Sequence, residues 1–319
     1  MSDIREKILA RLDRSSQPLS GDLLAQELGL SRTGIWKHIE QLRKSGADII
    51  ASSGQGYSLQ KEIFSSGPLT ARCNGKRIGK RILIVNQTDS TNRDVMAEAD
   101  QGAEEGLVIF ADKQRAGKGR LGRRWHTLNE SLACSILLRP DLPPEQVPQL
   151  SLLTAVALHD ALSSFSSEIG IKWPNDILHK GAKLAGILTE MRAEPGRVHA
   201  VVLGFGINLA APVQGWPSDI NQQATDLFTI RGRKTSKLDV AAAILNALDY
   251  WYDIYLQQGF TPIHTAWWRA HAASGQKVRV FDGRSYIDGV ASALDDDGAL
   301  LLQTTSGTQR IIAGDLEIQ

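Results

Sequence analysis

The segment from Gln114 to Trp125 restricts the fold most, because it places three glycines and five Lys or Arg residues within twelve positions. Apolar runs typical of buried strands flank it at 107–110 and 131–138. An unpaired buried charge is costly, so these cations either stay in solvent or face an anion. Glycines let backbone N–H groups approach phosphate oxygens, and Arg and Lys donate charge-assisted hydrogen bonds. The segment predicts a phosphate-binding loop, with a solvated basic loop as the alternative.

Better-known phosphate motifs do not account for this loop. The spacing of Gly117, Gly119 and Gly122 matches a dinucleotide-binding fingerprint, but that motif opens a helix and here a second strand-like run follows. A P-loop would need Gly-Lys-Ser/Thr at a fixed spacing, and a protein kinase would need its catalytic motifs further on. Neither pattern occurs in the required order.

The N-terminal part, residues 1–64, predicts a winged helix–turn–helix domain. Apolar residues at helical spacing over 4–13 indicate a first helix. Ser20 and Ser31 resemble N-caps of two further helices, with Gly29 as the turn between them. Two short strand-like runs at 48–51 and 56–59 then predict a hairpin.

The third of these helices carries several cations and one acid, Glu40, between Ser31 and about Ser45. This composition favours a recognition helix in a DNA major groove, with the hairpin against phosphates. A small helical module for protein contacts is the alternative. The residues predicted to contact DNA are Ser31, Arg32, Thr33, Lys37 and His38.

The middle of the chain, residues 65–272, predicts a central α/β domain that follows a linker at about 60–80. Three small polar residues, 90–92, lie where a strand meets a helix, so they either cap the helix or hold a polar ligand. Lys172 precedes Trp-Pro-Asn-Asp, and Lys183 opens another apolar strand. Two lysines in such places suggest convergence with the basic loop on one anionic ligand, although Pro-Asn-Asp is also ordinary turn chemistry.

The C-terminal part, residues 273–319, alternates strand-like runs with glycine turns. Asp282-Gly283 and Asp297-Gly298 are strong hairpin signals, and the pattern predicts a small SH3-like β-barrel. The segment 211–229 before it is long enough for a loop that closes over a ligand.

Whole-chain properties give broad limits. A net charge of +1 argues neither for nor against nucleic acid as a partner. The two cysteines lie far apart in sequence, which suggests a reducing compartment. No apolar run reaches the length of a signal peptide or a membrane span. We expect a cytoplasmic protein with no membrane partner.

Four motifs together resemble the biotin protein ligase family. In chain order they read Gly-Lys-Gly-Arg-Leu-Gly-Arg-Arg-Trp, Lys-Trp-Pro-Asn-Asp, Lys-Leu-Ala-Gly-Ile-Leu-Thr-Glu and Gly-Phe-Gly-Ile-Asn. With the winged helix ahead of them, the chain resembles the bifunctional ligases that also repress the biotin operon. The resemblance spans nearly the whole chain and implies an α+β multidomain protein whose central domain has a mixed sheet.

The resemblance also implies a reaction and its partners. Biotin and ATP would form biotinyl-5′-AMP with Mg²⁺, and biotin would pass to a lysine of the biotin carboxyl carrier protein of acetyl-CoA carboxylase. The adenylate would favour a homodimer that binds the biotin operator. The chemistry suits the sequence, because attack of a carboxylate on phosphorus needs positioning and charge neutralisation more than a protein nucleophile.

Residue roles follow from the same resemblance. The implied biotin contacts are Ser90, Thr91, Asn92, Gln114, Lys118, Gly119, Arg120 and Lys183. The implied ATP and adenylate contacts are Lys118, Arg120, Arg123, Trp125, Asn175, Lys183, Asn208 and Trp216. The implied catalytic residues are Arg120, Lys183 and Asp176, and Asn175 would lie near the metal.

The chain departs from the family pattern at three places. Lys118 stands where Arg is frequent, which keeps the charge but loses the fork geometry of a guanidinium. Leu121 replaces a common second Arg, and Leu-Ala follows Asn208 in place of Val-Asn. Two alternatives stay open: a lipoate-type ligase would not be expected to bring the winged helix, and a non-catalytic biotin sensor would lack the phosphate cations.

Overall fold

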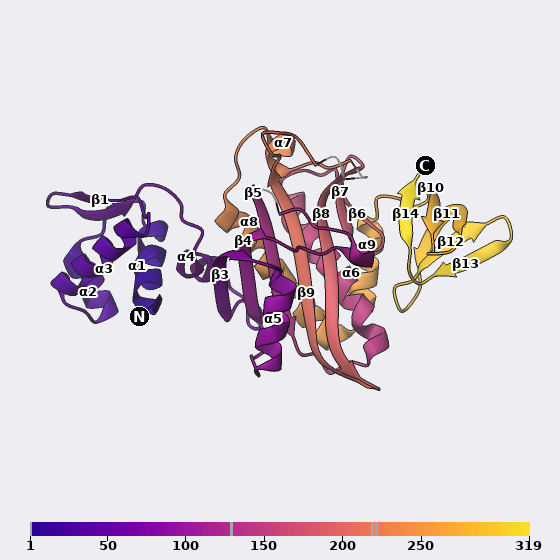
Figure 1. Ribbon diagram of the computed structural model, residues 1–319, viewed down its shortest axis with the longest axis horizontal. Helices are drawn as coiled ribbons and strands as arrows, with labels where there is room; N and C mark the ends of the chain where they lie inside the picture. The colour runs from indigo at the N-terminus through magenta and orange to yellow at the C-terminus, as the bar shows by residue number, and fades with distance from the viewer. Residues whose placement is uncertain (1, 128–129, 218–219, 221–222) are drawn as a thin grey trace. The chain divides into compact units, whose positions relative to one another are not determined.

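The computed structural model describes residues 2–127, 130–217, 220 and 223–319 (Figure 1). It divides into two compact units, one made of Met1–Asn74 with Ser236–Ala242 and the other of Gly75–Thr235 with Ala243–Gln319. Across the described ranges, no helix combines the length and the apolar character that a membrane span requires.

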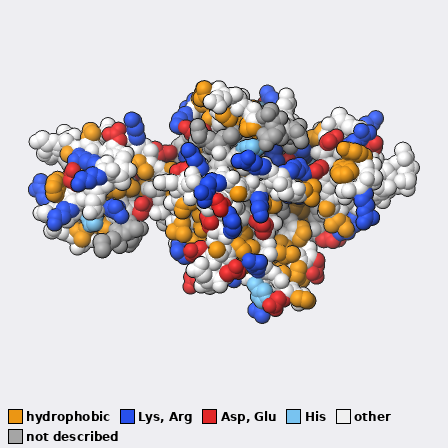
Figure 2. Space-filling view, viewed as in Figure 1, with side chains coloured by type: hydrophobic (Ala, Val, Ile, Leu, Met, Phe, Trp, Pro, Cys, Tyr) orange, Lys and Arg blue, Asp and Glu red, His pale blue; other side chains and the backbone are white. Residues whose placement is uncertain are grey.

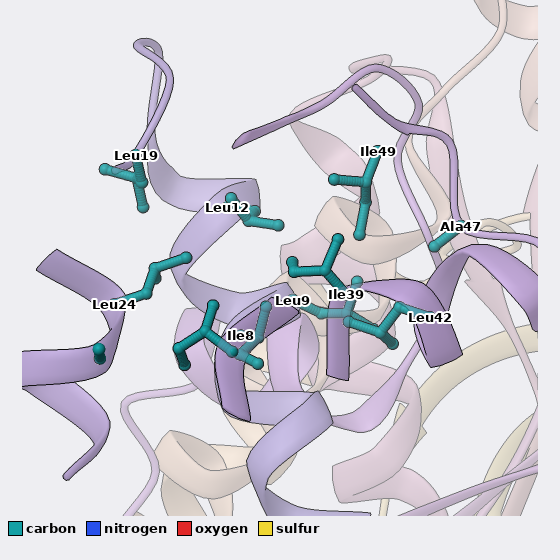
Figure 3. Close-up of a cluster of buried hydrophobic side chains, with 11 residues drawn as sticks. Ile8, Leu9, Leu12, Leu19, Leu24, Ile39, Leu42, Ala47 and Ile49 are labelled. Carbon is teal, nitrogen blue, oxygen red and sulfur yellow. The ribbon is translucent and has the colours of Figure 1, made fainter. Parts of the chain in front are cut away.

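The first unit is built on three helices and a hairpin. The helices are α1 (Ser2–Arg14), α2 (Gly21–Leu28) and α3 (Arg32–Lys44), and the hairpin pairs β1 (Ile49–Ser52) with β2 (Gly56–Leu59). Figure 3 shows its core, where apolar side chains from all three helices meet those of the wing. The labelled members are Ile8, Leu9, Leu12, Leu19, Leu24, Ile39, Leu42, Ala47 and Ile49.

Both predicted serine caps are confirmed. Ser20 Oγ accepts a hydrogen bond from the Leu23 N–H at 3.1 Å, and Ser31 Oγ accepts one from the Gly34 N–H at 3.1 Å. Each oxygen satisfies a backbone donor that a helix start leaves without a partner. Gly29 ends α2 with a φ of 66°, a conformation that favours glycine. The helix–turn–helix geometry therefore follows from local side-chain chemistry.

The predicted linker at 60–80 is wrong in part, because it contains the helix α4 (Ser66–Arg72). The Glu6 carboxylate accepts a hydrogen bond from the Gly67 N–H at 2.7 Å, and Arg72 forms an ion pair with Asp13. A side chain at Gly67 would meet the Glu6 carbonyl oxygen at 2.1 Å, so only glycine allows this close approach to α1. Tertiary contacts hold a helix that is too short to be predicted from its sequence.

A seven-stranded mixed sheet forms the centre of the second unit, in the strand order β3-β4-β5-β9-β8-β7-β6. Only β3 and β4 are parallel, and the other neighbours are antiparallel. The strands are β3 (Arg81–Thr88), β4 (Leu107–Gln114), β5 (Glu130–Leu138), β6 (Ile169–Lys172), β7 (Asp176–His179), β8 (Ala182–Glu194) and β9 (Arg197–Ala210).

Helices cover the sheet. In Figure 1, α5 (Thr91–Asp100) lies in front of the strands, whereas α6 (Val147–Ser163), α8 (Lys237–Gln258) and α9 (Thr261–Ala270) lie behind them. Val95 and Ala99 of α5 pack against Leu107 and Ile109 of β4. The alternate residues Val108 and Phe110 are also buried, as expected for a strand with both faces covered.

The turn chemistry noted at Pro-Asn-Asp lies between two strands, since β6 and β7 pair as a hairpin across Trp173, Pro174 and Asn175. The Trp173–Pro174 peptide bond is cis and lies in this turn. The turn presents Lys172 and Asp176 as a register pair at the end of the hairpin.

The C-terminal part is a five-stranded antiparallel sheet in the order β13-β12-β11-β10-β14. Its strands are β10 (Lys277–Phe281), β11 (Tyr286–Leu294), β12 (Leu300–Thr304), β13 (Gly307–Ile311) and β14 (Asp315–Ile318). Four of the strands were predicted, but β14 was not, because its alternation of polar and apolar residues extends over only four positions. A short helix, α7 (Leu227–Arg231), lies at the end of the predicted 211–229 loop, and residues 218–219 and 221–222 of that loop lie outside the described residues.

Candidate functional site

One cavity of about 580 Å³ gathers every residue predicted for the ligand site. It is bordered by the start of α5, the loop after β4, the β6–β7 turn, the glycine-containing parts of β8 and β9, and β14. The loop after β4 crosses the front of the sheet in Figure 1. The predicted residues along it are Ser90, Thr91, Asn92, Gln114, Lys118, Gly119, Arg120, Arg123, Trp125, Asn175, Asp176, Lys183, Asn208 and Trp216.

A buried polar network forms one end of the cavity. Gln114 Oε1 accepts a hydrogen bond from the Thr91 N–H at 2.8 Å, and Ser135 Oγ lies 2.6 Å from Asn92 Oδ1. Asn92 Nδ2 donates to the Glu190 carboxylate at 2.6 Å. Such a network fixes donors and acceptors in place, so this end can read a small polar head group.

Charged side chains form the other end. Lys183 Nζ lies 2.6 Å from Asp176 Oδ1, and Lys172 Nζ lies 3.7 Å from Asp176 Oδ2. Arg120 donates to Asn175 Oδ1 at 3.4 Å. Two lysines thus share one carboxylate and Arg120 contacts the neighbouring amide, which leaves positive charge for an anionic ligand. Figure 2 shows Lys and Arg side chains across the middle of this unit.

Burial alters the chemistry of two of these cations. It lowers the pKa of Lys172, opposed by the Asp176 carboxylate and reinforced by the nearby Lys183. It also lowers the pKa of Arg120, opposed by the carboxylate of Asp315. Desolvation disfavours the charged form, so a bound anion would relieve an existing cost at both positions.

Trp125 lies flat on the floor of the cavity. A Cβ at Gly206 would meet its indole at 2.2 Å, and a Cβ at Gly186 would meet it at 3.1 Å. Lys183 Nζ lies 5.8 Å from the centre of the ring. Within the described residues, the buried Nε1–H of Trp125 has no hydrogen-bond partner. Glycine at 206 is therefore required for the indole to reach the sheet.

The C-terminal sheet contacts the predicted phosphate loop. Arg120 donates to the Gly314 carbonyl at 3.4 Å, and Arg123 forms an ion pair with Asp315 of β14. Within the loop, Leu121 is 76% exposed and has a φ of 55°, a strained conformation for a residue with a Cβ. The position that departs from the family pattern is thus an exposed, strained tip.

Asn208 contacts the backbone of the segment near α7. Its Nδ2 donates to the Thr225 carbonyl at 3.0 Å and lies 3.4 Å from the Lys183 carbonyl. Trp216 lines the cavity from the same side and is half-buried. Asn208 therefore joins the end of β9 to the 211–229 segment.

Lys172 and Asp315 line the cavity but received no role from the family resemblance, although Lys172 was predicted with Lys183 to face an anionic ligand. Lys172 was noted in the sequence as a lysine at the end of a strand. Its spacing of four residues to Asp176 across the turn was the signal that it lies beside this carboxylate. Asp315 could not be found in this way, because it comes from another sheet and no local pattern marks it.

The first unit presents the candidate DNA interface on α3. Arg32, Thr33 and Lys37 are exposed, whereas His38 is half-buried and the Ser31 hydroxyl caps the helix. Arg43 is not a free cation, since it donates to the Ile49 carbonyl of β1 at 2.8 Å and to Glu40 at 2.7 Å. Arg43 thus fixes the wing to the recognition helix.

Protein-family models match three separate parts of the chain. Residues 84–208 match the biotin/lipoate A/B protein ligase family, residues 4–58 match an HTH domain, and residues 273–318 match the biotin protein ligase C-terminal domain. The class of protein is therefore a biotin/lipoate-type ligase with an added helix–turn–helix.

Similar proteins narrow the class further. The chain is 36% identical to the bifunctional ligase/repressor BirA of Bacillus spizizenii over 99% of both chains, and 28% identical to that of Escherichia coli over 94% of this chain and 92% of the other. The biotin protein ligase from Aquifex aeolicus in complex with biotin and ATP shares the fold, with a TM-score of 0.65, 24% identity, and coverage of 75% of this chain and 99% of that one. The chain belongs to the BirA family of bifunctional biotin ligase/repressors.

Proposed function

We propose that the chain activates biotin with ATP to form biotinyl-5′-AMP, transfers biotin to a lysine of a biotin carboxyl carrier protein, and represses biotin genes when it carries the adenylate. The observation that carries the ligase assignment is the single cavity with a polar network at one end and cations at the other. Family membership and the relatives named BirA support both activities.

The polar end suits the ureido group of biotin. Thr91, Asn92 and Gln114 offer fixed donors and acceptors, and Ser90 lies beside them at the helix start. The valeryl chain would then pass toward Lys118 and Gly119, and its carboxylate would reach Arg120 and Lys183. The neutral polar groups at one end of the path and the cations at the other would set the direction of the ligand.

Adenylation follows from this placement. The biotin carboxylate oxygen attacks the α-phosphorus of ATP and the bond to pyrophosphate breaks. Arg120, Arg123 and Lys183 neutralise the developing charge, which is the main contribution that a protein makes to such a transfer. Trp125, Asn208 and Trp216 are proposed to contact the nucleotide.

Transfer then needs an unprotonated carrier lysine. Its amine attacks the acyl carbon and the bond to AMP breaks. Asp176 is engaged by Lys183 and Lys172. When the adenylate phosphate attracts Lys183, the Asp176 carboxylate is released to orient the incoming amine and accept its proton.

Mg²⁺ is proposed to enter with ATP. The described residues include no group of three or more His, Cys, Asp or Glu side chains placed to hold a metal. This donor set fits an ion that is held mainly by substrate phosphates, as is common for Mg²⁺. Asn175 would be the protein residue that helps to hold the ion.

We propose three functional domains: 1–64 for DNA binding, 65–272 for ligation and 273–319 as an SH3-like barrel. The strand order of the C-terminal sheet supports a barrel, since five antiparallel strands follow one another as neighbours except for the last. We also propose that the adenylate-bound form is a homodimer and acts in the cytoplasm, where ATP and DNA are both available.

Lys183→Ala tests the proposed ligase mechanism. We expect pyrophosphate release from biotin and ATP to fall by about a hundredfold or more, the scale of a lost transition-state charge contact. Lys180→Ala is the control, because that lysine lies in the neighbouring turn and pairs only with Glu168 at 2.9 Å in the described structure. Equal activity of Lys183→Ala and the control would contradict the mechanism. Activity of the wild type with lipoate instead of biotin would contradict the substrate.

A further inference from the structure

Trp36 is a large apolar side chain that the first unit leaves in solvent. It lies on α3 and is 52% exposed, and it is not part of the buried core of this unit. Burying the remaining apolar surface of an indole would be favourable, at about 25 cal/mol for each Å² removed from water. The folded unit therefore gains little free energy from this half-exposed indole, whereas binding of a partner that covered it would gain more.

The position of Trp36 on the helix defines what such a partner would meet. Thr33 lies three residues before it and Lys37 one residue after it, and both are exposed. Arg43 lies seven residues later, on the same side of α3, and is bound to the Ile49 carbonyl of the wing. Trp36 thus projects from the wing side of the N-terminal half of the helix.

The charges around Trp36 favour a polyanion as the partner. Arg32 and Lys37 flank it, and Lys44 follows on the outer face of the helix. Glu40, the acid of α3, is neutralised by Arg43 at 2.7 Å. Figure 2 shows several Lys and Arg side chains on the viewed face of this unit. In a helix–turn–helix the N-terminal half of the second helix meets base edges, so an aromatic residue here would face bases rather than phosphates.

We propose that Trp36 is a specificity-determining residue that reads a thymine in the major groove of the operator. This inference rests on the proposed DNA-binding function. Thymine presents a C5-methyl group beside the O4 acceptor. An indole presents an apolar ring and a single N–H donor, so it complements both features at once. No other base offers a methyl group and an acceptor together in that groove.

Selection from a randomised DNA duplex library tests the proposal, with the full chain in the presence of biotin and ATP. Wild type should select a site with a preferred A·T pair in each half-site. Trp36→Ala should lose the preference at that one pair, by about tenfold, and keep the others, since one base contact is lost. Tyr250→Ala is the control, because it removes a 60%-exposed aromatic side chain from the second unit.

A methyl deletion then isolates the contact. Replacing the preferred thymine by deoxyuridine removes only the C5-methyl group, and we expect wild-type affinity to fall by about threefold or more, as for a lost apolar base contact. The same replacement should leave the affinity of Trp36→Ala unchanged. Thermal unfolding and pyrophosphate release should match wild type in both variants, which shows that the fold is intact.

Three outcomes would overturn the inference. If Trp36→Ala lowered the affinity for every DNA sequence equally, Trp36 would contact the DNA backbone and not a base. If Trp36→Ala left DNA binding unchanged, the indole would be available to a protein partner instead. Equal sensitivity of wild type and Trp36→Ala to deoxyuridine would exclude the methyl contact. If wild type bound no duplex while pyrophosphate release was normal, the proposed repressor function itself would fail.

Discussion

At the scale of single residues, Arg120 shows how one side chain can serve two contacts. It reaches Asn175 of the β6–β7 turn and the Gly314 carbonyl of the C-terminal part. Both contacts are 3.4 Å long and neutral, so neither satisfies the charge of a half-buried guanidinium. An adenylate phosphate would supply the missing anion.

Arg120→Gly should therefore fold normally but release biotinyl-5′-AMP into solution. We expect free adenylate, and labelling of lysines on unrelated proteins, to rise by about tenfold or more because a charged clamp is removed. Arg115→Gly is the matched control, since Arg115 lies in the same loop and pairs with Asp89 at 2.9 Å. Adenylate retention equal to that of the control would remove Arg120 from this role.

The contacts within the protein do not explain why residue 34 is a glycine. A Cβ there would meet Ser31 Oγ at 3.4 Å and Leu30 Cβ at 3.7 Å, which are ordinary contacts. Glycine inside a helix is less favourable than alanine by about 1 kcal/mol. Its presence in α3 is explained if DNA approaches the backbone closely.

We expect Gly34→Ala to stabilise the first unit by about 0.5–1 kcal/mol and to weaken operator binding by about tenfold, the scale of one disturbed base contact. Chemical denaturation and fluorescence anisotropy with labelled DNA measure the two effects separately. A gain in stability without any loss of affinity would show that DNA does not approach this position.

At the scale of elements, local signals could be read from the sequence and tertiary ones could not. The caps Ser20 and Ser31, the glycine turn and the basic loop all act within a few residues, and all were predicted. Helix α4 and strand β14 depend on distant partners, Glu6 for one and Lys277–Phe281 for the other. Both segments are short, at seven and four residues, so their own sequences give only weak signals.

The residues of the candidate site also fall into those that the sequence predicts and those that only tertiary contacts bring to the site. Its fourteen predicted residues come from the family resemblance, and the fold places all of them along one cavity. Asp315 joins the site only because β14 lies against the phosphate loop. The network from Asn92 to Glu190 likewise depends on a sheet that brings α5 and β8 together.

The junction of α9 with β6 predicts a pH dependence of stability. His271 Nδ1 donates to the Ile171 carbonyl at 3.0 Å, and its ring stacks on Trp267 with the centroids 4.7 Å apart. Among the described residues, the buried Nε2 has no hydrogen-bond partner. Burial lowers the pKa of His271 from 6.5 to about 4, although the bond to Ile171 opposes the change.

Between these two pKa values the unfolded chain binds a proton that the folded chain does not. Stability is therefore fully present above about pH 6.5 and decreases as the pH falls toward 4, by at most about 3 kcal/mol. His271→Gln should flatten that part of the profile in denaturant titrations. His199→Gln is the control, since His199 is only half-buried and lies 3.4 Å from the Glu194 carboxylate. A profile unchanged by His271→Gln would exclude this residue as the cause.

At the scale of the whole molecule, the proposed repression depends on ligation chemistry only if the bound adenylate changes the affinity of the protein for DNA. One winged helix offers few base contacts, whereas a dimer doubles them on a two-fold operator. The adenylate favours the dimer only if it binds the dimer-competent state more tightly than the monomer. The 114–125 loop lines the cavity, and so does the described part of 211–229, so both are candidates for ordering by the ligand.

Operator affinity should therefore rise when biotin and ATP are both present, by about 5- to 150-fold, the usual range of an allosteric coupling of 1–3 kcal/mol. Sedimentation and DNA footprinting with and without the two substrates measure dimerisation and binding together. Lys183→Ala is the control, because it should not form the adenylate and so should not respond to biotin and ATP. Unmodified carrier protein should lower operator occupancy, since it consumes the adenylate. Dimerisation and footprinting that are equally strong without substrates would refute the switch, and the ligase mechanism would remain to be judged by pyrophosphate release alone.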